Sequence, residues 1–520
     1  MDVSIIEKRR VELQADCDRQ RSQADRNKLG QFATPFELAR DIIAATIPHL
    51  GAKSIRFLDP AFGTGAFYSA LLEVAGDRVD SAMAFEVDPH YGTPTLRLWN
   101  STGLKLRVED FTRADVGQSH ANLVICNPPY VRHHHLSVSE KTALRLTSHA
   151  LGVKLNGLAG LYCYFMALAH RWLDPGAVCA WLVPSEFMDV NYGEAIKHYL
   201  LSDVTLVRIH RFDPNEVQFS DALVSSAVVW FKNQKPDPKA VVSMTFGGTV
   251  TRPRISRNVT LTDLHSEAKW TRLPGILDRA PDCSLGVRLG DLFAVKRGIA
   301  TGNNQFFILT EERVAELGLS QLFLKPILPS PRYLEQDEIE GDEVGAPILD
   351  RRLYLIDCAL SESEVKKIDP ALGQYLKSGR DTVAQGYLCK SRSPWYSQEK
   401  RPPAHILCTY MGRTDGNGKK AFRFIFNRSK ATAANVYLFL YPKSVIRNAL
   451  EDIGVLKQVF QLLKSIPAED MTYEARVYGG GLHKLEPSEL AKVRADRIAD
   501  LLLGANRHTR GVQMALPQVG

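Results

Sequence analysis

The stretch FLDPAFGTGAFYSALL (residues 57–72) decides the fold. Its apolar start predicts a strand that ends at Asp59, Gly63 and Gly65 predict a tight turn, and its apolar end predicts a helix. A strand that enters a helix through such a turn is the first unit of a doubly wound α/β sheet, which binds ligands at the carboxyl ends of its strands. Aromatic residues stand where a dinucleotide-binding loop has its third glycine, so the sequence disfavours a pyrophosphate ligand.

Strands and helices alternate along the chain from about residue 31 to residue 231. We expect strands at 55–59, 82–86, 104–108, 122–126, 178–183, 204–209 and 223–231. We expect amphipathic helices at 35–47, 66–74, 158–172 and 187–200. The alternation predicts an α/β, Rossmann-like fold with a seven-stranded, mostly parallel sheet, whose last strand is antiparallel because it directly follows another strand.

Acidic residues stand at the ends of three successive expected strands. Asp59 can pair with a cationic amino group, and Glu86, 27 residues later, can hydrogen-bond both hydroxyls of a ribose. In VEDF (108–111), Asp110 and Phe111 can bracket an adenine ring. Each acid alone is as readily a loop cap, but a ligand with an adenine, a free ribose and an amino-acid tail fits all three. The sequence therefore predicts an S-adenosylmethionine site.

The most specific motif is NPPY (127–130), which follows the fourth expected strand. Two consecutive prolines fix the backbone there. An adenine amino group is a weak nucleophile, because its lone pair is delocalised into the ring, and a site that accepts both N6 hydrogens favours attack on a sulfonium methyl. Asn127 offers a side-chain oxygen, Pro128 a backbone carbonyl and Tyr130 a flat face for an extruded base. The alternative is an Asn-Pro-Pro turn that only ends a strand.

The residues around NPPY argue against two other chemistries. Cys126 precedes the asparagine and does not stand in a Pro-Cys pair, so covalent attack on a cytosine ring has no nucleophile. The three histidines at 133–135 point apart in an extended loop and no further ligand is indicated, so we expect no metal site. Arg132, beside them, is expected to contact the DNA backbone.

The region from Ala371 to Val445 holds 13 Lys and Arg against 3 Asp and Glu, so its charge of +10 exceeds the +7 of the whole chain. The same region holds 11 aromatic residues, among them Trp395, Tyr396, Tyr410, Phe422, Phe424 and Phe426. Basic residues interleaved with aromatic ones are typical of a surface that neutralises phosphates and packs against bases. The alternative is a solvated strand face with its core aromatics.

In order and in motif, the chain resembles the gamma-class adenine-N6 DNA methyltransferases of bacterial type II restriction–modification systems. KLGQFATP (28–35) is similar to the motif that precedes their cofactor loop, DPAFGTG (59–65) to that loop, and NPPY to their catalytic motif. Segments of their recognition domains are similar to residues 292–309, 390–396 and 478–487. The resemblance implies transfer of a methyl group from S-adenosylmethionine to N6 of a flipped-out adenine in double-stranded DNA, which protects host DNA.

The resemblance also implies roles for single residues. Thr34 and Pro35 hold the methionine end of the cofactor, and Phe219 sandwiches the flipped base with Tyr130, unless Phe219 is only core packing. The expected cofactor contacts are Thr34, Pro35, Asp59, Pro60, Ala61, Gly63, Gly65, Glu86, Asp110 and Phe111. The expected catalytic residues are Asn127, Pro128, Pro129, Tyr130 and Phe219. The expected DNA contacts are Arg132, Lys390, Arg392, Trp395, Tyr396, Arg413, Lys419 and Lys420.

These motifs divide the chain into four parts. A charged N-terminal helix (1–25) either caps the catalytic domain (26–235) or reaches toward DNA. A connecting segment (236–284) begins where the composition shifts, and a mixed α+β recognition domain (285–520) follows. Helices are expected in that domain at 445–464 and 486–503. We expect a monomer, because one chain holds both catalysis and recognition.

The bulk properties favour a protein of the bacterial cytoplasm. The eight cysteines form no CxxC pair, which indicates reduced thiols. No apolar run is long enough to span a membrane, and the N-terminus is too charged for a secretory signal. We find no acid–acid–Glu–Lys nuclease cluster, so a cognate restriction endonuclease is expected to act as a separate protein.

Three alternative functions stay open. Enzymes that methylate a protein glutamine or a guanine in RNA share NPPY, but they usually lack the FATP segment and a long basic domain. Cytosine-N4 enzymes generally carry Ser or Asp where Asn127 stands. A DNA-binding specificity protein with an inactive catalytic domain has no need of the intact cofactor and catalytic residues found in this chain.

Overall fold

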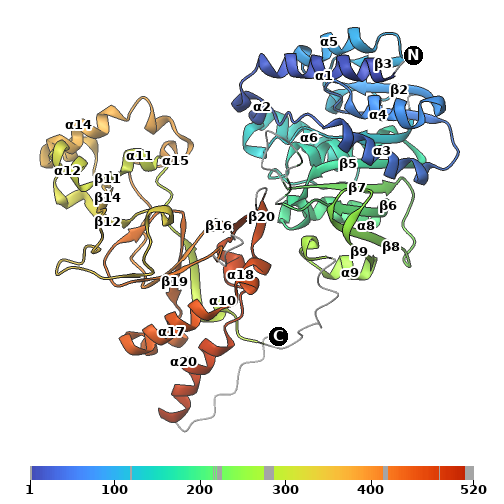
Figure 1. The fold of residues 1–520 in the computed structure, drawn as a ribbon. Helices are drawn as coiled ribbons and strands as arrows, with labels where there is room; N and C mark the ends of the chain where they lie inside the picture. The colour runs from blue at the N-terminus through green and yellow to red at the C-terminus, as the bar shows by residue number, and fades with distance from the viewer. Residues whose placement is uncertain are drawn as a thin grey trace. The chain divides into compact units, whose positions relative to one another are not determined.

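The computed structural model describes residues 3–509, apart from residues 118–119, 215, 217, 219–224, 274–285, 414–419 and 479–480. The chain divides into two compact units, Met1–Asp282 with Val477–Gly481, and Cys283–Arg476 with Leu482–Gly520. In Figure 1 the first unit runs from blue to green and the second from yellow to red.

A nine-stranded sheet forms the centre of the first unit, in the order β3-β2-β1-β4-β5-β7-β6-β8-β9. Its strands are β1 (Ile55–Asp59), β2 (Val79–Phe85), β3 (Leu104–Arg107), β4 (Ala121–Cys126), β5 (Leu173–Pro184), β6 (Thr205–Arg211), β7 (Ser226–Lys232), β8 (Val241–Gly248) and β9 (Pro253–Thr260). The strands from β3 to β5 are parallel, so the ends of β1, β2 and β4 meet at one edge. Strand β7 is antiparallel to β5 and β6, as the sequence predicts.

The sheet has nine strands and not the expected seven. Strand β8 pairs in parallel with β6, and β9 pairs antiparallel with β8. Strand β8 buries Val242 and Met244, but β9 is mostly exposed and carries little hydrophobic pattern. This polar edge strand explains the error, and residues 241–260 extend the catalytic sheet where a connecting segment was expected.

Helices cover both faces of this sheet (Figure 1). On one face α3 (Phe36–Leu50) and α4 (Ala66–Ala75) enclose a core that includes Ile42, Leu71 and Trp230. On the other face α7 (Leu161–Ala169) and α8 (Glu194–Ser202) enclose a second core. The remaining helices are α5 (Pro89–Trp99), α6 (Val138–Ala150) and α9 (Leu261–Ser266).

The N-terminal segment forms two helices and not one, α1 (Val3–Arg19) and α2 (Gln23–Leu29). The break follows from Ser22, whose side chain accepts a hydrogen bond from Asp25 N and begins the second helix. Ile6 of α1 belongs to the core that α3 and α4 enclose, so the segment caps the first unit.

The second unit contains a five-stranded and a four-stranded sheet, and the chain also forms a three-stranded sheet, whose strand at residues 476–478 includes a boundary between the two units. In order, they are β10-β19-β15-β17-β13, β11-β14-β12-β18 and β16-β21-β20. The strands are β10 (Phe293–Arg297), β11 (Ile308–Thr310), β12 (Leu324–Leu328), β13 (Glu338–Ile339), β14 (Leu353–Ile356), β15 (Ile406–Thr409), β16 (Met411–Arg413), β17 (Phe424–Asn427), β18 (Thr432–Ala433), β19 (Tyr437–Pro442), β20 (Arg476–Tyr478) and β21 (Leu482–Lys484). The helices are α10 (Leu289–Leu292), α11 (Asn304–Phe307), α12 (Glu311–Leu317), α13 (Glu362–Ile368), α14 (Pro370–Ser378), α15 (Tyr387–Lys390), α16 (Ser444–Arg447), α17 (Ile453–Ser465), α18 (Ala468–Glu474), α19 (Pro487–Leu490) and α20 (Asp496–Thr509).

Two expected helices of this unit are each divided. The expected helix 445–464 is α16, a 3-10 turn and α17, with Asp452 capping the start of α17. The expected helix 486–503 is α19 and α20, because the residues between them form a turn and an isolated bridge to the chain near residue 288. There Leu289 N donates to Val493 O at 2.8 Å, and Ala495 N donates to Val287 O at 2.8 Å.

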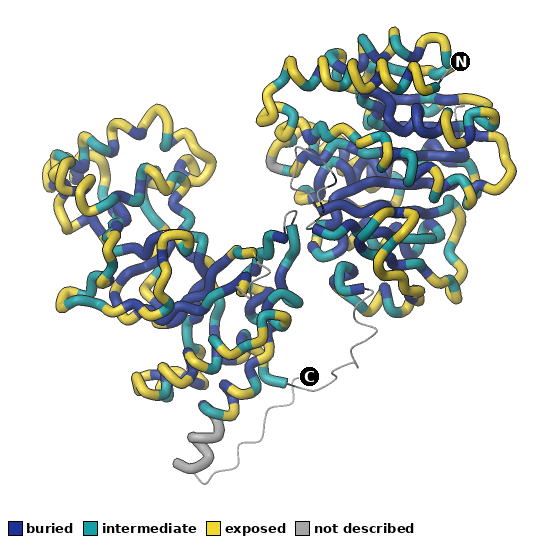
Figure 2. The backbone as a smooth tube through the Cα atoms, in the orientation of Figure 1, coloured by how far each residue is buried: buried dark blue, intermediate teal, exposed yellow. Residues whose placement is uncertain are grey.

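The aromatic residues of the basic region are mostly core residues. The five-stranded sheet is buried, as its dark blue strands in Figure 2 show. The aromatic rings on and beside its strands belong to the hydrophobic clusters around it. Of the six aromatic residues named for this region, five have buried rings, each at most 5% exposed: Tyr396, Tyr410, Phe422, Phe424 and Phe426. The alternative interpretation of this region, a strand face with core aromatics, therefore holds for these five rings.

Among the described residues, no helix is both long and apolar enough to cross a membrane.

Candidate active site

The glycine loop joins β1 to α4 at the carboxyl edge of the sheet. Gly63 and Gly65 have φ angles of 57° and 92°, in the region that favours glycine. A Cβ atom on Gly65 would lie 2.5 Å from the Phe62 ring, so a larger residue does not fit. Because α4 begins directly after the loop, its N-terminal N–H groups and positive dipole end lie beside any ligand bound there.

Asp59, at the end of β1, is a buried acid. Its side chain is 1% exposed, and its Oδ1 accepts a hydrogen bond from Ala61 N at 3.1 Å. Burial raises the pKa of Asp59 to about 7. A cationic group that entered this position would favour the ionised carboxylate, which suits the expected contact with an amino group.

Glu86 connects the second strand to the glycine loop. Its Oε2 accepts from Gly63 N at 2.9 Å, and its Oε1 accepts from Asp88 N at 2.8 Å. Burial raises the pKa of Glu86 to about 6. Each carboxylate oxygen can accept a further hydrogen bond, so Glu86 orders the loop and can still bind a ribose hydroxyl.

The residues expected around the adenine ring are placed differently. Asp110 is partly exposed and its Oδ1 accepts from Thr112 N at 2.9 Å, so it caps a 3-10 turn. Phe111 is 1% exposed, with its ring edge-on to that of Phe85 at 5.3 Å, so the structure buries its faces in the core and corrects the expected bracketing. Val87, which no pattern in the sequence singled out, lies directly after Glu86, and its apolar side chain is 62% exposed.

Asn127 has one end of its amide fixed and the other unpaired. Its Nδ2 donates to Phe32 O at 3.0 Å and to Thr34 Oγ1 at 3.1 Å. These bonds orient the side chain, so that its Oδ1 is an acceptor. That Oδ1 is buried and has no hydrogen-bond partner among the described residues. A buried unpaired acceptor costs about 1–3 kcal/mol, which a ligand donor would recover.

Tyr130 lies in the core in this conformation. It is 8% exposed, its hydroxyl donates to Leu182 O at 3.1 Å, and its ring lies 5.5 Å from that of Phe32. The structure therefore fixes Tyr130 but does not present the flat ring face that was expected. Of the neighbouring prolines, Pro128 is buried and Pro129 is partly exposed.

The FATP segment contacts the catalytic loop directly. Thr34 accepts from Asn127, and Pro35, which is exposed, immediately precedes α3. Pro60 is buried and Ala61 partly exposed in the glycine loop. The structure thus brings the expected cofactor loop and catalytic loop to one edge of the sheet. Phe219 lies outside the described residues.

The expected DNA contacts fall into two groups. Arg132, Lys390 and Arg413 are exposed. Arg392 is half-buried, and its guanidinium donates to Thr301 O at 2.8 Å and to Ala300 O, so it holds two loops together. Lys419 lies outside the described residues.

Both expected aromatic contacts are structural. Tyr396 is fully buried and its hydroxyl donates to Leu360 O at 2.5 Å, which contradicts its expected contact with DNA. Trp395 is partly buried, and its ring packs against those of Phe306 and Phe307. The exposed aromatic residue of the region is Tyr387 on α15, at 88%. Composition alone could not have singled it out.

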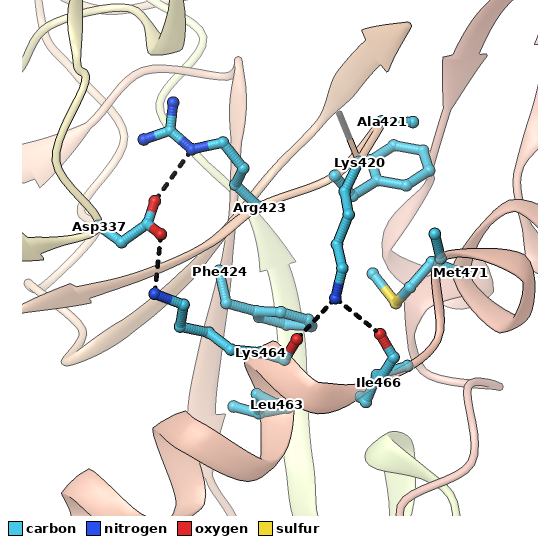
Figure 3. A pocket seen from close by; sticks show the side chains of 11 residues that line it. Asp337, Lys420, Ala421, Arg423, Phe424, Leu463, Lys464, Ile466 and Met471 are labelled. Carbon is cyan, nitrogen blue, oxygen red and sulfur yellow. Dashed lines mark hydrogen bonds and ion pairs between the residues drawn. The ribbon is translucent and has the colours of Figure 1, made fainter. Parts of the chain in front are cut away.

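Lys420 lines a pocket of about 130 Å³ in the second unit (Figure 3). Its Nζ donates to Lys464 O at 2.8 Å and to Ile466 O at 3.2 Å, so it binds the end of α17. Asp337 pairs with Arg423 and with Lys464, each at 3.0 Å. Asp337 thus pairs with two of the basic side chains around this pocket, and Lys420, which bonds to two backbone carbonyls, has a structural role.

Two family descriptions match the chain. Residues 276–508 match "Type II methyltransferase M.Eco57I, C-terminal domain", and residues 98–218 match "Eco57I restriction-modification methylase". The chain is 26% identical over 504 residues to the type II methyltransferase M.AccI of Acinetobacter calcoaceticus, over 92% of this chain and 87% of that protein. It is 28% identical over 494 residues to the type II methyltransferase M.XamI of Xanthomonas campestris pv. amaranthicola, and the match covers 91% of this chain and 86% of that protein.

The fold is also similar to that of two proteins solved in complex with DNA. The type IIL enzyme MmeI, solved in complex with DNA, has a TM-score of 0.51 and 13% identity, over 89% of this chain and 63% of its own. DrdV, also solved with DNA, has a TM-score of 0.50 and 13% identity, and the match covers 90% of this chain and 55% of DrdV. The chain spans less than two thirds of either protein, and this likeness concerns the fold alone. From the matched families and relatives, the chain is similar in both of its units to type II restriction–modification methyltransferases of the Eco57I type.

Proposed function

We propose that this chain transfers a methyl group from S-adenosylmethionine to N6 of an adenine flipped out of double-stranded DNA, and so protects host DNA in a restriction–modification system. The observation that carries the proposal is the buried, unpaired Oδ1 of Asn127, held as an acceptor by the bonds of its Nδ2. An exocyclic amino group supplies the missing donor. The relatives M.AccI and M.XamI are type II methyltransferases, which supports this class of substrate.

The residues of the carboxyl edge fit S-adenosylmethionine, which supplies a methyl group on a sulfonium. Asp59 would bind its amino group, because a buried acid whose pKa is raised gains from a cation. Glu86 would accept from the ribose hydroxyls, and Val87 and Asp110 would contact the adenine edge. Thr34 and Pro35 are proposed at the methionine end.

For the target base, we propose two acceptors. Asn127 Oδ1 and the Pro128 carbonyl accept the two N6 hydrogens, which draws the nitrogen lone pair out of the ring and aims it at the methyl group. Tyr130 and Phe219 are proposed to stack on the base, and Tyr130 must then turn from its bond to Leu182 O. No strong general base is needed, because the methylated nitrogen is acidic and loses its proton to water.

Contacts with DNA are proposed for residues that are exposed in the described part of the chain, and for Lys419, which lies outside that part. Arg132, Lys390, Arg413 and Lys419 neutralise phosphates, and Tyr387 takes the place that the sequence analysis assigned to Trp395 and Tyr396.

The affinity for S-adenosylmethionine should rise with pH between 5.5 and 7.5, by about tenfold or more. Burial raises the pKa of Asp59 to about 7 and that of Glu86 to about 6, so both are largely protonated in the free protein at pH 5.5. Binding of a cation needs ionised Asp59, so a proton must leave at low pH. Titration calorimetry across this pH range measures both the Kd and the protons released. A Kd that does not change with pH would contradict the role of Asp59.

Tyr387→Ala should weaken binding of specific duplex DNA about tenfold and leave its salt dependence unchanged, because ring packing releases no counterions. Lys390→Ala should instead lower the slope of log K against log salt by about 1. Tyr387→Phe is the matched control and should bind as the wild type does. Fluorescence anisotropy at several salt concentrations measures each affinity, and wild-type affinity in Tyr387→Ala would remove this residue from the DNA surface.

The reaction itself is tested with purified chain, S-adenosylmethionine labelled in its methyl group, and unmethylated duplex DNA. Label in N6-methyldeoxyadenosine after digestion is the expected result. Label in N4-methyldeoxycytidine would make cytosine the substrate. Label only in added RNA or protein would support the other NPPY enzymes.

A further inference from the structure

The N-terminal arm (residues 3–34) contacts all three loops of the candidate active site. These loops are the glycine loop after β1, the loop after β2 that contains Glu86, and the catalytic loop after β4. Each contact uses different residues of the arm, and each involves polar groups that are partly or fully buried. Loops from three different strands are thus bonded to one continuous segment of chain.

The first contact is a buried arginine at the glycine loop. Arg10 is 4% exposed, and its Nε and Nη2 donate to the carboxylate of Glu7, both at 2.7 Å. Its Nη1 donates to Thr64 Oγ1 at 3.0 Å, between the two loop glycines. Thr64 Oγ1 in turn donates to Gln14 Oε1 at 2.8 Å. Helix α1 therefore fixes the one side chain that stands between Gly63 and Gly65.

The second contact fixes the orientation of Glu86. The Asp88 carboxylate accepts from both Nη atoms of Arg21, with Nη2 to Oδ1 at 3.1 Å, and from Gln31 Nε2 at 2.9 Å. The Asp88 backbone N–H donates to Glu86 Oε1. Although burial acts to raise it, the hydrogen bonds from Gln31 and Arg21 lower the pKa of Asp88, so its carboxylate stays ionised. Arg21 and Gln31 of the arm thus fix Asp88, and Asp88 in turn fixes Glu86.

The third contact joins the arm to the catalytic loop. Gly30 has a φ of 65°, and its carbonyl accepts from Tyr130 N at 3.1 Å. A Cβ atom on Gly30 would lie 2.4 Å from Tyr130 N, so the two chains touch. Phe32 O and Thr34 Oγ1 accept from Asn127 Nδ2.

We propose that the N-terminal arm is a positioning element that holds the cofactor loops and the catalytic loop in one register, with Arg10 and Arg21 as its positioning residues. This inference rests on the proposed function of the same site. Through Asp88, Arg21 acts on the cofactor and not on the transfer step. Loss of Arg21 therefore weakens cofactor binding, while the rate at saturating cofactor is retained.

The test compares Arg21→Ala with Arg19→Ala, a matched control two residues earlier, at the end of α1. Arg19 is 73% exposed and pairs only with Asp16 among the described residues. Titration calorimetry gives the Kd of S-adenosylmethionine, methyl transfer at saturating cofactor gives kcat, and thermal unfolding gives the stability of each variant. We expect Arg21→Ala to raise the Kd about tenfold, with kcat within about twofold of the wild type and Arg19→Ala unchanged.

Gln31→Met, which removes one donor to Asp88, is the second variant if Arg21→Ala does not fold. We expect it to raise the Kd by a smaller factor in the same direction. Unchanged Kd values with a lowered unfolding temperature would overturn the proposal, since the arm would then only stabilise the fold. Absence of binding by the wild-type chain would contradict the proposed function itself.

Discussion

Asn127→Ala is expected to reduce methyl transfer by about 10³-fold, in line with the loss of one oriented hydrogen-bonding group at a reacting atom. The substitution removes the Oδ1 that is proposed to accept a hydrogen bond from the target amino group. The stability should change little, because the variant loses the bonds to Phe32 O and Thr34 but also loses a buried unpaired oxygen. Single-turnover methyl transfer to duplex DNA measures the effect.

The control for Asn127→Ala is binding. The Kd values for cofactor and DNA should stay within about threefold of the wild type, because Asn127 is proposed to act on the transfer step. Asn127→Asp keeps an acceptor but cannot donate to Phe32 O, so it should retain more transfer than Asn127→Ala. Equal transfer by Asn127→Ala and the wild type would remove Asn127 from the catalytic site.

Asp59→Asn should weaken cofactor binding about 100-fold, the effect of losing a charge-assisted hydrogen bond of about 1.5–3 kcal/mol. The same variant should be more stable than the wild type at pH 8. The folded-state pKa of Asp59 is raised to about 7, so between about pH 4 and 7 the folded state binds more protons than the unfolded one. The stability of the wild type therefore falls as the pH rises through this window, and a neutral amide avoids that loss.

Thermal unfolding without cofactor, at pH 5 and pH 8, separates the two effects. We expect Asp59→Asn to unfold about 5 °C higher than the wild type at pH 8, with a smaller difference at pH 5. The amide oxygen of the introduced asparagine can accept the hydrogen bond from Ala61 N, so the conformation of the loop should not change. A variant that binds cofactor as the wild type does would contradict the assignment of Asp59 to the amino group.

The catalytic loops could be predicted because their signals are local. Strand β1 has the predicted bounds, since a short apolar run ends at an acid and a glycine turn. NPPY follows β4 directly, and its two prolines allow few conformations. Strand β9 could not be predicted, because an edge strand in water needs no apolar alternation.

Roles that depend on burial could not be predicted from composition. Tyr396 and Tyr387 are nine residues apart in one basic region, yet one is fully buried and the other 88% exposed. Phe111 follows an acid at a strand end, as an adenine-binding residue would, but packs into the core. Arg10 bonds to Thr64, 54 residues away in the chain, and Arg21 bonds to Asp88, 67 residues away. No local sequence pattern predicts such pairs.

Sequencing of genomic DNA with detection of modified bases tests the central claim most directly, in cells that express this chain and in cells that express Asn127→Ala. We predict N6-methyladenine at one short recurring motif in the first cells and none at that motif in the second. Genomic DNA with no new N6-methyladenine in cells that express the folded wild-type chain would contradict the proposed function.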